Sequence, residues 1–225
     1  MTAESDNLSD FSNFLDVQIK TAWGRTLSEF ASFCAPSTGS PVPAALARAG
    51  RRPRPASVIL DIGCGPGLLP GIFARQGHTA IGIDSDFSLL TSFLSSNLTQ
   101  ADAFHLPFQS SSFDLVTATN VLFLLTDPLS ALREWKRVLA PDGELCLLNP
   151  SEHLSVATAR GLADQRGLAD TARSSLLNWA KNAESHFRWT EAETQDLLSQ
   201  TGLRLEETVL KVGPGFARFV RAEVH

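Results

Sequence analysis

Short apolar runs alternate with helical stretches through the middle of this chain. The run over 58–60 is apolar and β-branched, which predicts a buried strand of a parallel sheet. After a glycine-rich turn, residues 68–76 have helical spacing, and Gly77 is placed to end that helix. A second apolar strand over 80–83 leads directly into Asp84. The order of strand, turn, helix, strand and acid predicts one unit of an α/β fold.

The alternation continues to the end of the chain. A Thr-Glu-Ala-Glu capping box at 190–193 predicts the start of one helix. Upstream, the apolar residues of 8–34 recur at three- and four-residue steps, as in an amphipathic helical segment broken into two. The other expected elements are a helix over 89–98, a strand beginning at 113–114, a helix over 128–139, a turn at 141–143, a strand over 144–148, a helix around 176–180, and two strands over 203–212 and 216–224.

The turn after the first strand carries the candidate chemistry. Gly63, Gly65 and Gly67 let the backbone fold tightly and approach a ligand, and the following helix offers free amide donors. Asp84, 21 residues after Gly63, is placed where a carboxylate can accept hydrogen bonds from both hydroxyls of a ribose. A dinucleotide fingerprint needs a further glycine at position 68, where this chain has Leu68. A nicotinamide-dependent oxidoreductase is therefore disfavoured.

The alternate glycines preceded by Asp61 resemble motif I of the class I S-adenosylmethionine-dependent methyltransferases. The pair Asp102-Ala103 and the strand introduced at 113–114 resemble the next landmarks of that family, and the similarity is clearest over 57–150. The resemblance implies a Rossmann-like α/β fold: a seven-stranded, mostly parallel sheet with an antiparallel last strand, helices on both faces and a helical cover. It also implies S-adenosylmethionine as cofactor, with S-adenosylhomocysteine as product. The cofactor-binding residues that it implies are Asp61, Gly63, Gly65, Gly67, Asp84, Ser85, Asp102, Ala103 and Asn120.

The same resemblance suggests where the methyl acceptor would bind. We expect one domain over 1–225, with an N-terminal cover over 1–36, a cofactor-binding core over 57–150, a helical cap over 151–188 and a C-terminal helix and hairpin over 189–225. The candidate lid or substrate residues are Trp23, Arg25 and Phe123, the last forming an apolar wall where many relatives carry a histidine pair. His153, just beyond the fifth strand, is a weak candidate for a catalytic base. The chain lacks the Asn-Pro-Pro-aromatic motif of methyltransferases acting on nucleobases or glutamine, so those acceptors are not expected.

Composition and charge exclude some classes of partner and of protein. A net charge of −5 argues against nucleic acid as the main partner, and no run reaches the ~18 apolar residues of a membrane span. Three widely spaced cysteines and an acidic start indicate a cytoplasmic protein without a disulfide framework or a metal site. We therefore expect methyl transfer to a small organic acceptor, at an oxygen, nitrogen or carbon atom. A non-catalytic methyltransferase-like domain that works through a partner is the alternative.

Overall fold

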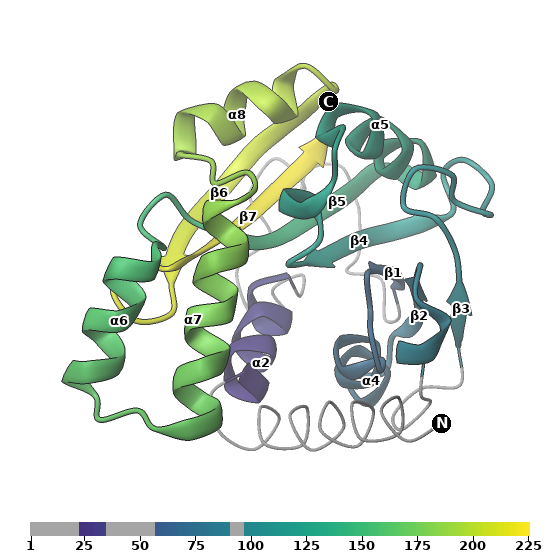
Figure 1. Cartoon of the computed structure of the whole chain (residues 1–225). Coiled ribbons are helices and arrows are strands. Elements are labelled where there is room, and N and C mark those ends of the chain that lie inside the picture. The colour runs from purple at the N-terminus through teal and green to yellow at the C-terminus, as the bar shows by residue number, and fades with distance from the viewer. Residues whose placement is uncertain (1–22, 35–56, 91–96) are drawn as a thin grey trace.

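The computed structural model describes residues 23–34, 57–90 and 97–225. Seven strands form one sheet in the order β3-β2-β1-β4-β5-β7-β6, with helices on both faces (Figure 1). The strands are β1 (Val58–Ile62), β2 (Thr79–Asp84), β3 (Leu98–Gln100), β4 (Phe113–Thr119), β5 (Leu139–Pro150), β6 (Leu203–Lys211) and β7 (Ala217–Val224). β7 is antiparallel to both of its neighbours, and the pairs from β3 to β5 are parallel. The predicted sheet, with its antiparallel last strand and terminal hairpin, is confirmed.

The helices divide between the two faces of the sheet. They are α2 (Trp23–Cys34), α4 (Leu68–Arg75), α5 (Pro128–Val138), α6 (Val156–Gln165), α7 (Asp170–Glu184) and α8 (Glu191–Ser199), with 3₁₀ turns η1 (Phe87–Leu89) and η2 (Leu122–Leu124). One buried cluster joins α2 and α4 to the sheet, and a second joins α5 and α8 to the opposite face. Within the ranges described, no helix combines the length and apolar character needed to cross a membrane.

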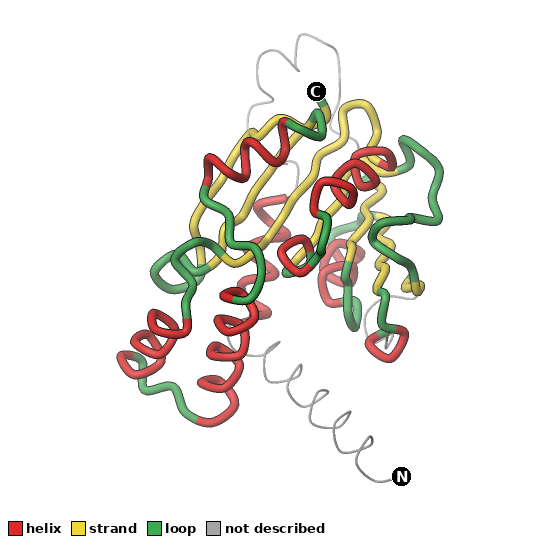
Figure 2. The backbone as a smooth tube through the Cα atoms, turned by 45° about the horizontal axis from the view of Figure 1, so that its top comes forward, coloured by secondary structure: helices red, strands yellow, loops and turns green. Residues whose placement is uncertain are grey.

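The helices α6 and α7 lie side by side and extend beyond the edge of the sheet (Figure 2). Small residues let them approach closely, because Ala159, Ala180 and Ala183 are fully buried together with Phe216. The pentapeptide Arg-Gly-Leu-Ala-Asp occurs twice: the copy at 160–164 lies within α6, and the copy at 166–170 spans the break between α6 and α7. The predicted cap segment is therefore a helical hairpin with its own small core.

Several predicted boundaries were wrong. Leu98 begins β3 instead of ending a helix, since its side chain packs where Gly67 and Gly82 have no Cβ, and η1 covers only the start of the predicted helix. Residues 91–96 of that prediction lie outside the described residues. The expected turn at 141–143 is an irregularity within β5, because Phe113 pairs with Leu139 while Leu115 pairs with Glu144. The helix before it gives way to strand directly after Val138.

The carboxyl ends of the parallel strands share one edge of the sheet. Ile62, Asp84, Thr119 and Pro150 are the last residues of β1, β2, β4 and β5. The antiparallel β7 begins at this edge, where Ala217 pairs with Pro150. Open α/β sheets bind their ligands outside these ends. The predicted glycine turn, Asp84 and Asn120 lie at or directly after these strand ends.

Candidate functional site

The glycine turn between β1 and α4 has the conformation that its sequence predicts. Gly63 and Gly65 have φ angles of 68° and 52°, in the left-handed region that glycine adopts without steric cost. A Cβ on Gly63 would lie 2.1 Å from Cγ2 of Val121, so the turn after β4 packs directly on the glycine turn. A Cβ on Gly65 would meet nothing within 4 Å. The backbone at Gly65 therefore faces open space that a ligand can enter.

Asp84 is fixed beside this open backbone. Its Oδ2 accepts a hydrogen bond of 2.9 Å from the Gly65 amide, and its Oδ1 accepts one of 3.0 Å from the Asp86 amide. Each carboxylate oxygen has two lone pairs, so both can still accept a bond from a hydroxyl. The last residue of β2 is thus oriented toward the glycine turn before any ligand binds. This arrangement fits the ribose contact expected from the sequence.

Asp61 lies beneath the turn in a polar row that crosses the sheet. In register, Asp61 pairs with Thr117, Thr117 with Cys146, and Cys146 with Arg221. The Thr117 hydroxyl donates a 2.7 Å hydrogen bond to Oδ1 of Asp61. Burial raises the pKa of Asp61, the Thr117 bond lowers it and the charge of Asp84 raises it, and the net result is a pKa of about 7. The carboxyl group can therefore gain or lose a proton near neutral pH.

The other predicted cofactor residues of the β2–β3 region lie next to Asp84. The Ala101 amide donates to the Asp84 carbonyl over 3.0 Å, and the Gln100 side chain donates to the Ser85 carbonyl over 2.9 Å. β3 ends at Gln100, so Asp102 follows the strand by two residues instead of closing it. Asp102 is exposed and Ala103 is half-buried. The amide of Phe104 and the ring of His105 donate to the Asp102 carboxylate and lower its pKa.

The turn after β4 is covered by the cap. Asn120 has a φ of 57°, and its Oδ1 accepts a 3.0 Å hydrogen bond from the Trp179 indole of α7. Phe123 is buried, with the ring of His186 edge-on at 6.0 Å, and its carbonyl accepts a 3.3 Å bond from the Phe187 amide. The role of Phe123 as an apolar wall of the acceptor site stays a prediction, because the contacts of its ring and carbonyl are with His186 and Phe187. Phe123 thus faces the segment after α7, which the sequence did not predict.

The remaining candidates lie away from the glycine turn. The described part of the N-terminal cover packs on the sheet through Phe30, whose ring meets Phe219 edge-on at 5.1 Å, while Arg25 is exposed. Residues 1–22 of that cover and the side chain of Trp23 lie outside the described part. His153 is half exposed, with Nε2 3.5 Å from Oε1 of Glu152. The lid role of Trp23 and Arg25 and the base role of His153 stay predictions.

Comparison with known proteins gives the family of the core. Residues 60–147 match the family model described as a methyltransferase domain. This segment is a methyltransferase domain. The predicted resemblance is confirmed, and with it S-adenosylmethionine as the cofactor of this type of domain. A further match, 30% identical over 56% of this chain and 55% of its own length, is an uncharacterized methyltransferase of Schizosaccharomyces pombe.

Other relatives of the methyltransferase domain have named activities. The ubiquinone/menaquinone biosynthesis C-methyltransferase of Vibrio parahaemolyticus is 36% identical over 44% of this chain and 43% of its own length. Among solved structures, magnesium protoporphyrin IX methyltransferase of Synechocystis, with bound S-adenosylhomocysteine, has a TM-score of 0.59 at 16% identity, covering 94% of this chain and 88% of that one. That likeness shows the fold. The chain spans about half the length of the curated relatives that it matches.

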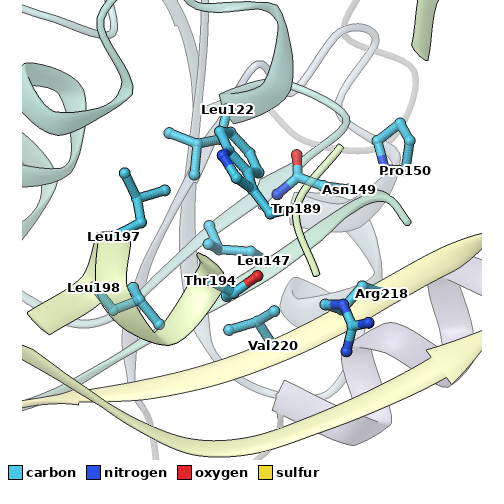
Figure 3. Close-up of a pocket in the computed structure, with 10 residues that line it drawn as sticks. All are labelled: Leu122, Leu147, Asn149, Pro150, Trp189, Thr194, Leu197, Leu198, Arg218 and Val220. Atoms are coloured by element: carbon cyan, nitrogen blue, oxygen red, sulfur yellow. The ribbon is translucent and has the colours of Figure 1, made fainter. Parts of the chain in front are cut away.

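Sequence reasoning missed a polar group at the far side of the strand ends. Arg218 is only 5% exposed, and its guanidinium donates to both oxygens of Glu152 over 2.8 and 2.9 Å. Burial opposes the charge on Glu152, but the bonds from Arg218 hold the pKa of Glu152 below its usual value. Arg218 forms part of a pocket wall together with Asn149 and Trp189 (Figure 3). The sequence feature that could have revealed this group is the position of Arg218 within the mostly apolar predicted strand over 216–224.

Proposed function

We propose that this protein catalyses methyl transfer from S-adenosylmethionine to a small organic acceptor, at an oxygen, nitrogen or carbon atom. The observation that carries the proposal is the pairing of the open Gly65 backbone with the Asp84 carboxylate. This pairing leaves free space above the turn and a charged acceptor beside it. When bound, the cofactor supplies a methyl group on a positively charged sulfur, and that charge makes the methyl carbon electrophilic.

The chain's own residues would bind and align the reactants. Asp84 would accept from the ribose hydroxyls, and Asp102, just beyond β3, would accept from the adenine amino group, as the resemblance implies. Asp61 would become ionised if a cation bound close to it, because an opposite charge lowers the pKa of a carboxyl group. The buried Phe123 would exclude water from the reacting atoms. Alignment and exclusion of water then supply most of the catalysis, with a base needed only for acidic acceptors.

The named relatives support a small acceptor. They include a demethylmenaquinone methyltransferase of Corynebacterium kroppenstedtii and a ubiquinone biosynthesis O-methyltransferase of Haemophilus ducreyi. Together with the C-methyltransferase of Vibrio parahaemolyticus, the printed names cover transfer to both carbon and oxygen. They therefore favour a small acceptor and leave the acceptor atom open. The net charge of −5 also disfavours a nucleic acid as acceptor.

Two measurements test the proposal. Calorimetry is expected to show binding of S-adenosylmethionine and S-adenosylhomocysteine and negligible binding of nicotinamide dinucleotides, with binding lost or much weakened in Asp84→Ala. The exposed Asp196 of α8 provides a matched control, Asp196→Ala, in which cofactor binding is kept. Incubation of the protein with methyl-labelled cofactor and metabolite extracts is then expected to give a labelled small product. Absence of cofactor binding would overturn the proposal. Tight cofactor binding without methyl transfer to any molecule in the extracts would favour the non-catalytic alternative.

A further inference from the structure

The turn after β4 begins with a residue in an unfavourable backbone conformation. Asn120 has a φ of 57°, in the left-handed region, where a Cβ comes close to the following carbonyl oxygen. Asparagine tolerates this region better than most residues, because its short side chain can hydrogen-bond to nearby backbone. Here the side-chain oxygen instead accepts a bond from Trp179, 59 positions later in the sequence. The conformation of this turn is therefore stabilised by a distant helix, α7.

The same bond fixes the orientation of the Asn120 amide. An indole N–H can only donate, so the amide atom 3.0 Å from Nε1 of Trp179 must be the oxygen. The NH2 group of Asn120 then faces a different direction, and it makes no hydrogen bond to any of the described residues. Asn120 is one of the residues that the sequence predicts to bind the cofactor. Two donors of its side chain are thus left for a ligand.

Trp179 is itself held between two buried clusters. It packs against the cluster that joins α2 and α4 to the sheet, and against the core of the α6–α7 hairpin. Ala180, the next residue of α7, is fully buried in that second core. Because protein interiors are close-packed, a large ring held on two sides has little room for other rotamers, and its N–H keeps one direction. Trp179 can therefore orient Asn120 instead of following it.

The turn that begins at Asn120 is in contact with the proposed cofactor site. Val121, the next residue, fills the space where Gly63 of the glycine turn has no Cβ. A few residues further along the turn, the Phe123 carbonyl accepts a 3.3 Å bond from the Phe187 amide, which follows α7. The cap thus bonds to this turn at two points, one on each side of the residue that packs on the glycine turn. A change in the indole bond is therefore transmitted to the cofactor site through adjacent residues.

We propose that Trp179 is a positioning residue of the methyl-transfer site and acts through Asn120. This inference rests on the proposed function, since it assigns a role in that same site. The indole bond keeps the turn after β4 in the conformation that packs on the glycine turn, and it leaves the Asn120 amide donors available to the cofactor. Without the bond, a smaller fraction of the protein has this turn in the binding-competent conformation, and the apparent cofactor affinity falls by that fraction.

Calorimetry with S-adenosylhomocysteine tests the inference without requiring turnover. Trp179→Phe keeps an aromatic ring in the two clusters but removes the N–H, and it is expected to weaken binding roughly fivefold in a protein whose melting curve shows it to be folded. Glycine adopts the left-handed conformation without steric cost. In Asn120→Gly protein, Trp179→Phe is therefore expected to cause no further loss of affinity. Asn178→Ala, at the exposed neighbouring position of α7, is the matched control and keeps the parent's affinity.

A measurement on the parent protein covers the case in which Trp179→Phe does not fold. Coupling between two events is reciprocal, so a cofactor that favours this turn also strengthens the indole bond. Hydrogen exchange of the Trp179 indole N–H, followed by nuclear magnetic resonance, is expected to slow when S-adenosylhomocysteine is bound.

The outcomes separate this inference from the proposed function. With S-adenosylhomocysteine bound by the parent, unchanged indole exchange would overturn the role of Trp179. So would a folded Trp179→Phe protein with the parent's affinity, which would make the bond merely structural. An equal loss of affinity with Asn120 and with glycine at that position would also overturn it, because Trp179 would not act through Asn120. A parent protein that binds no S-adenosylhomocysteine would overturn the proposed function, and this inference with it.

Discussion

The ionisation of Asp61 gives the most quantitative prediction. Asp61 is 2% exposed, and the pKa of its carboxyl group in the folded protein is about 7 against an ordinary value of 3.8. Below pH 3.8 the group is neutral in both the folded and unfolded chain. As pH rises toward 7, the unfolded chain loses this proton while the folded protein keeps it, so stability falls, and above pH 7 the loss stops. The difference of about 3 between the two pKa values corresponds to about 4 kcal/mol.

Replacing Asp61 with asparagine isolates this effect. The amide oxygen of Asp61→Asn can still accept the hydrogen bond from Thr117, but the side chain no longer titrates. Urea unfolding at several pH values between 4.5 and 8.5 gives the free energy of unfolding of both proteins. The parent is expected to lose about 3 kcal/mol relative to the variant between pH 4.5 and 7, at roughly 1.4 kcal/mol per pH unit, and nothing further above that. A difference between the two proteins that does not change with pH would refute the reasoning. As a second check, Thr117→Val removes the bond that favours the charged form and is expected to extend the loss to higher pH.

Four further predictions concern the cofactor and the cover. Asp84→Ala is expected to lose about 2–4 kcal/mol of cofactor affinity in calorimetry while keeping the fold, and Asp84→Asn less, since the amide keeps part of the geometry; unchanged affinity would place the ribose contact elsewhere. Gly63→Ala is expected to lower the melting temperature more than Gly65→Ala, because only the first Cβ collides with Val121, whereas Gly65→Ala is expected to weaken cofactor binding. Hydrogen exchange with and without S-adenosylhomocysteine is expected to show protection of 8–34 and of part of 149–188 on binding, as for a closing lid; equal protection in both states would make them fixed helices. If these segments close as a lid, Trp23→Ala is expected to impair turnover more than it lowers the melting temperature.

The sequence alone was sufficient for the central part of the fold. The β-branched run before Asp61, the alternate glycines and the apolar strand before Asp84 are local signals, because strand, turn and helix propensities depend on neighbouring residues. The capping box at 190–193 belongs to the same class, and the structure shows both of its hydrogen bonds. The glycine turn, Asp84 and the family were predictable for this reason.

Tertiary structure decided what the local pattern could not. Leu98 is part of a strand because it fills the space beside Gly67 and Gly82, which are far from it in sequence. The pairing of Asn149 with Arg218 depends on the register between β5 and β7. Arg218 also binds Glu152, which lies 66 positions earlier in the sequence, so no local window contains these partners. Strand ends can be predicted from composition, but which side chains meet across them depends on the order of strands in the sheet. The sequence therefore determined the cofactor turn, and only the folded sheet brought together the buried polar pair beside it.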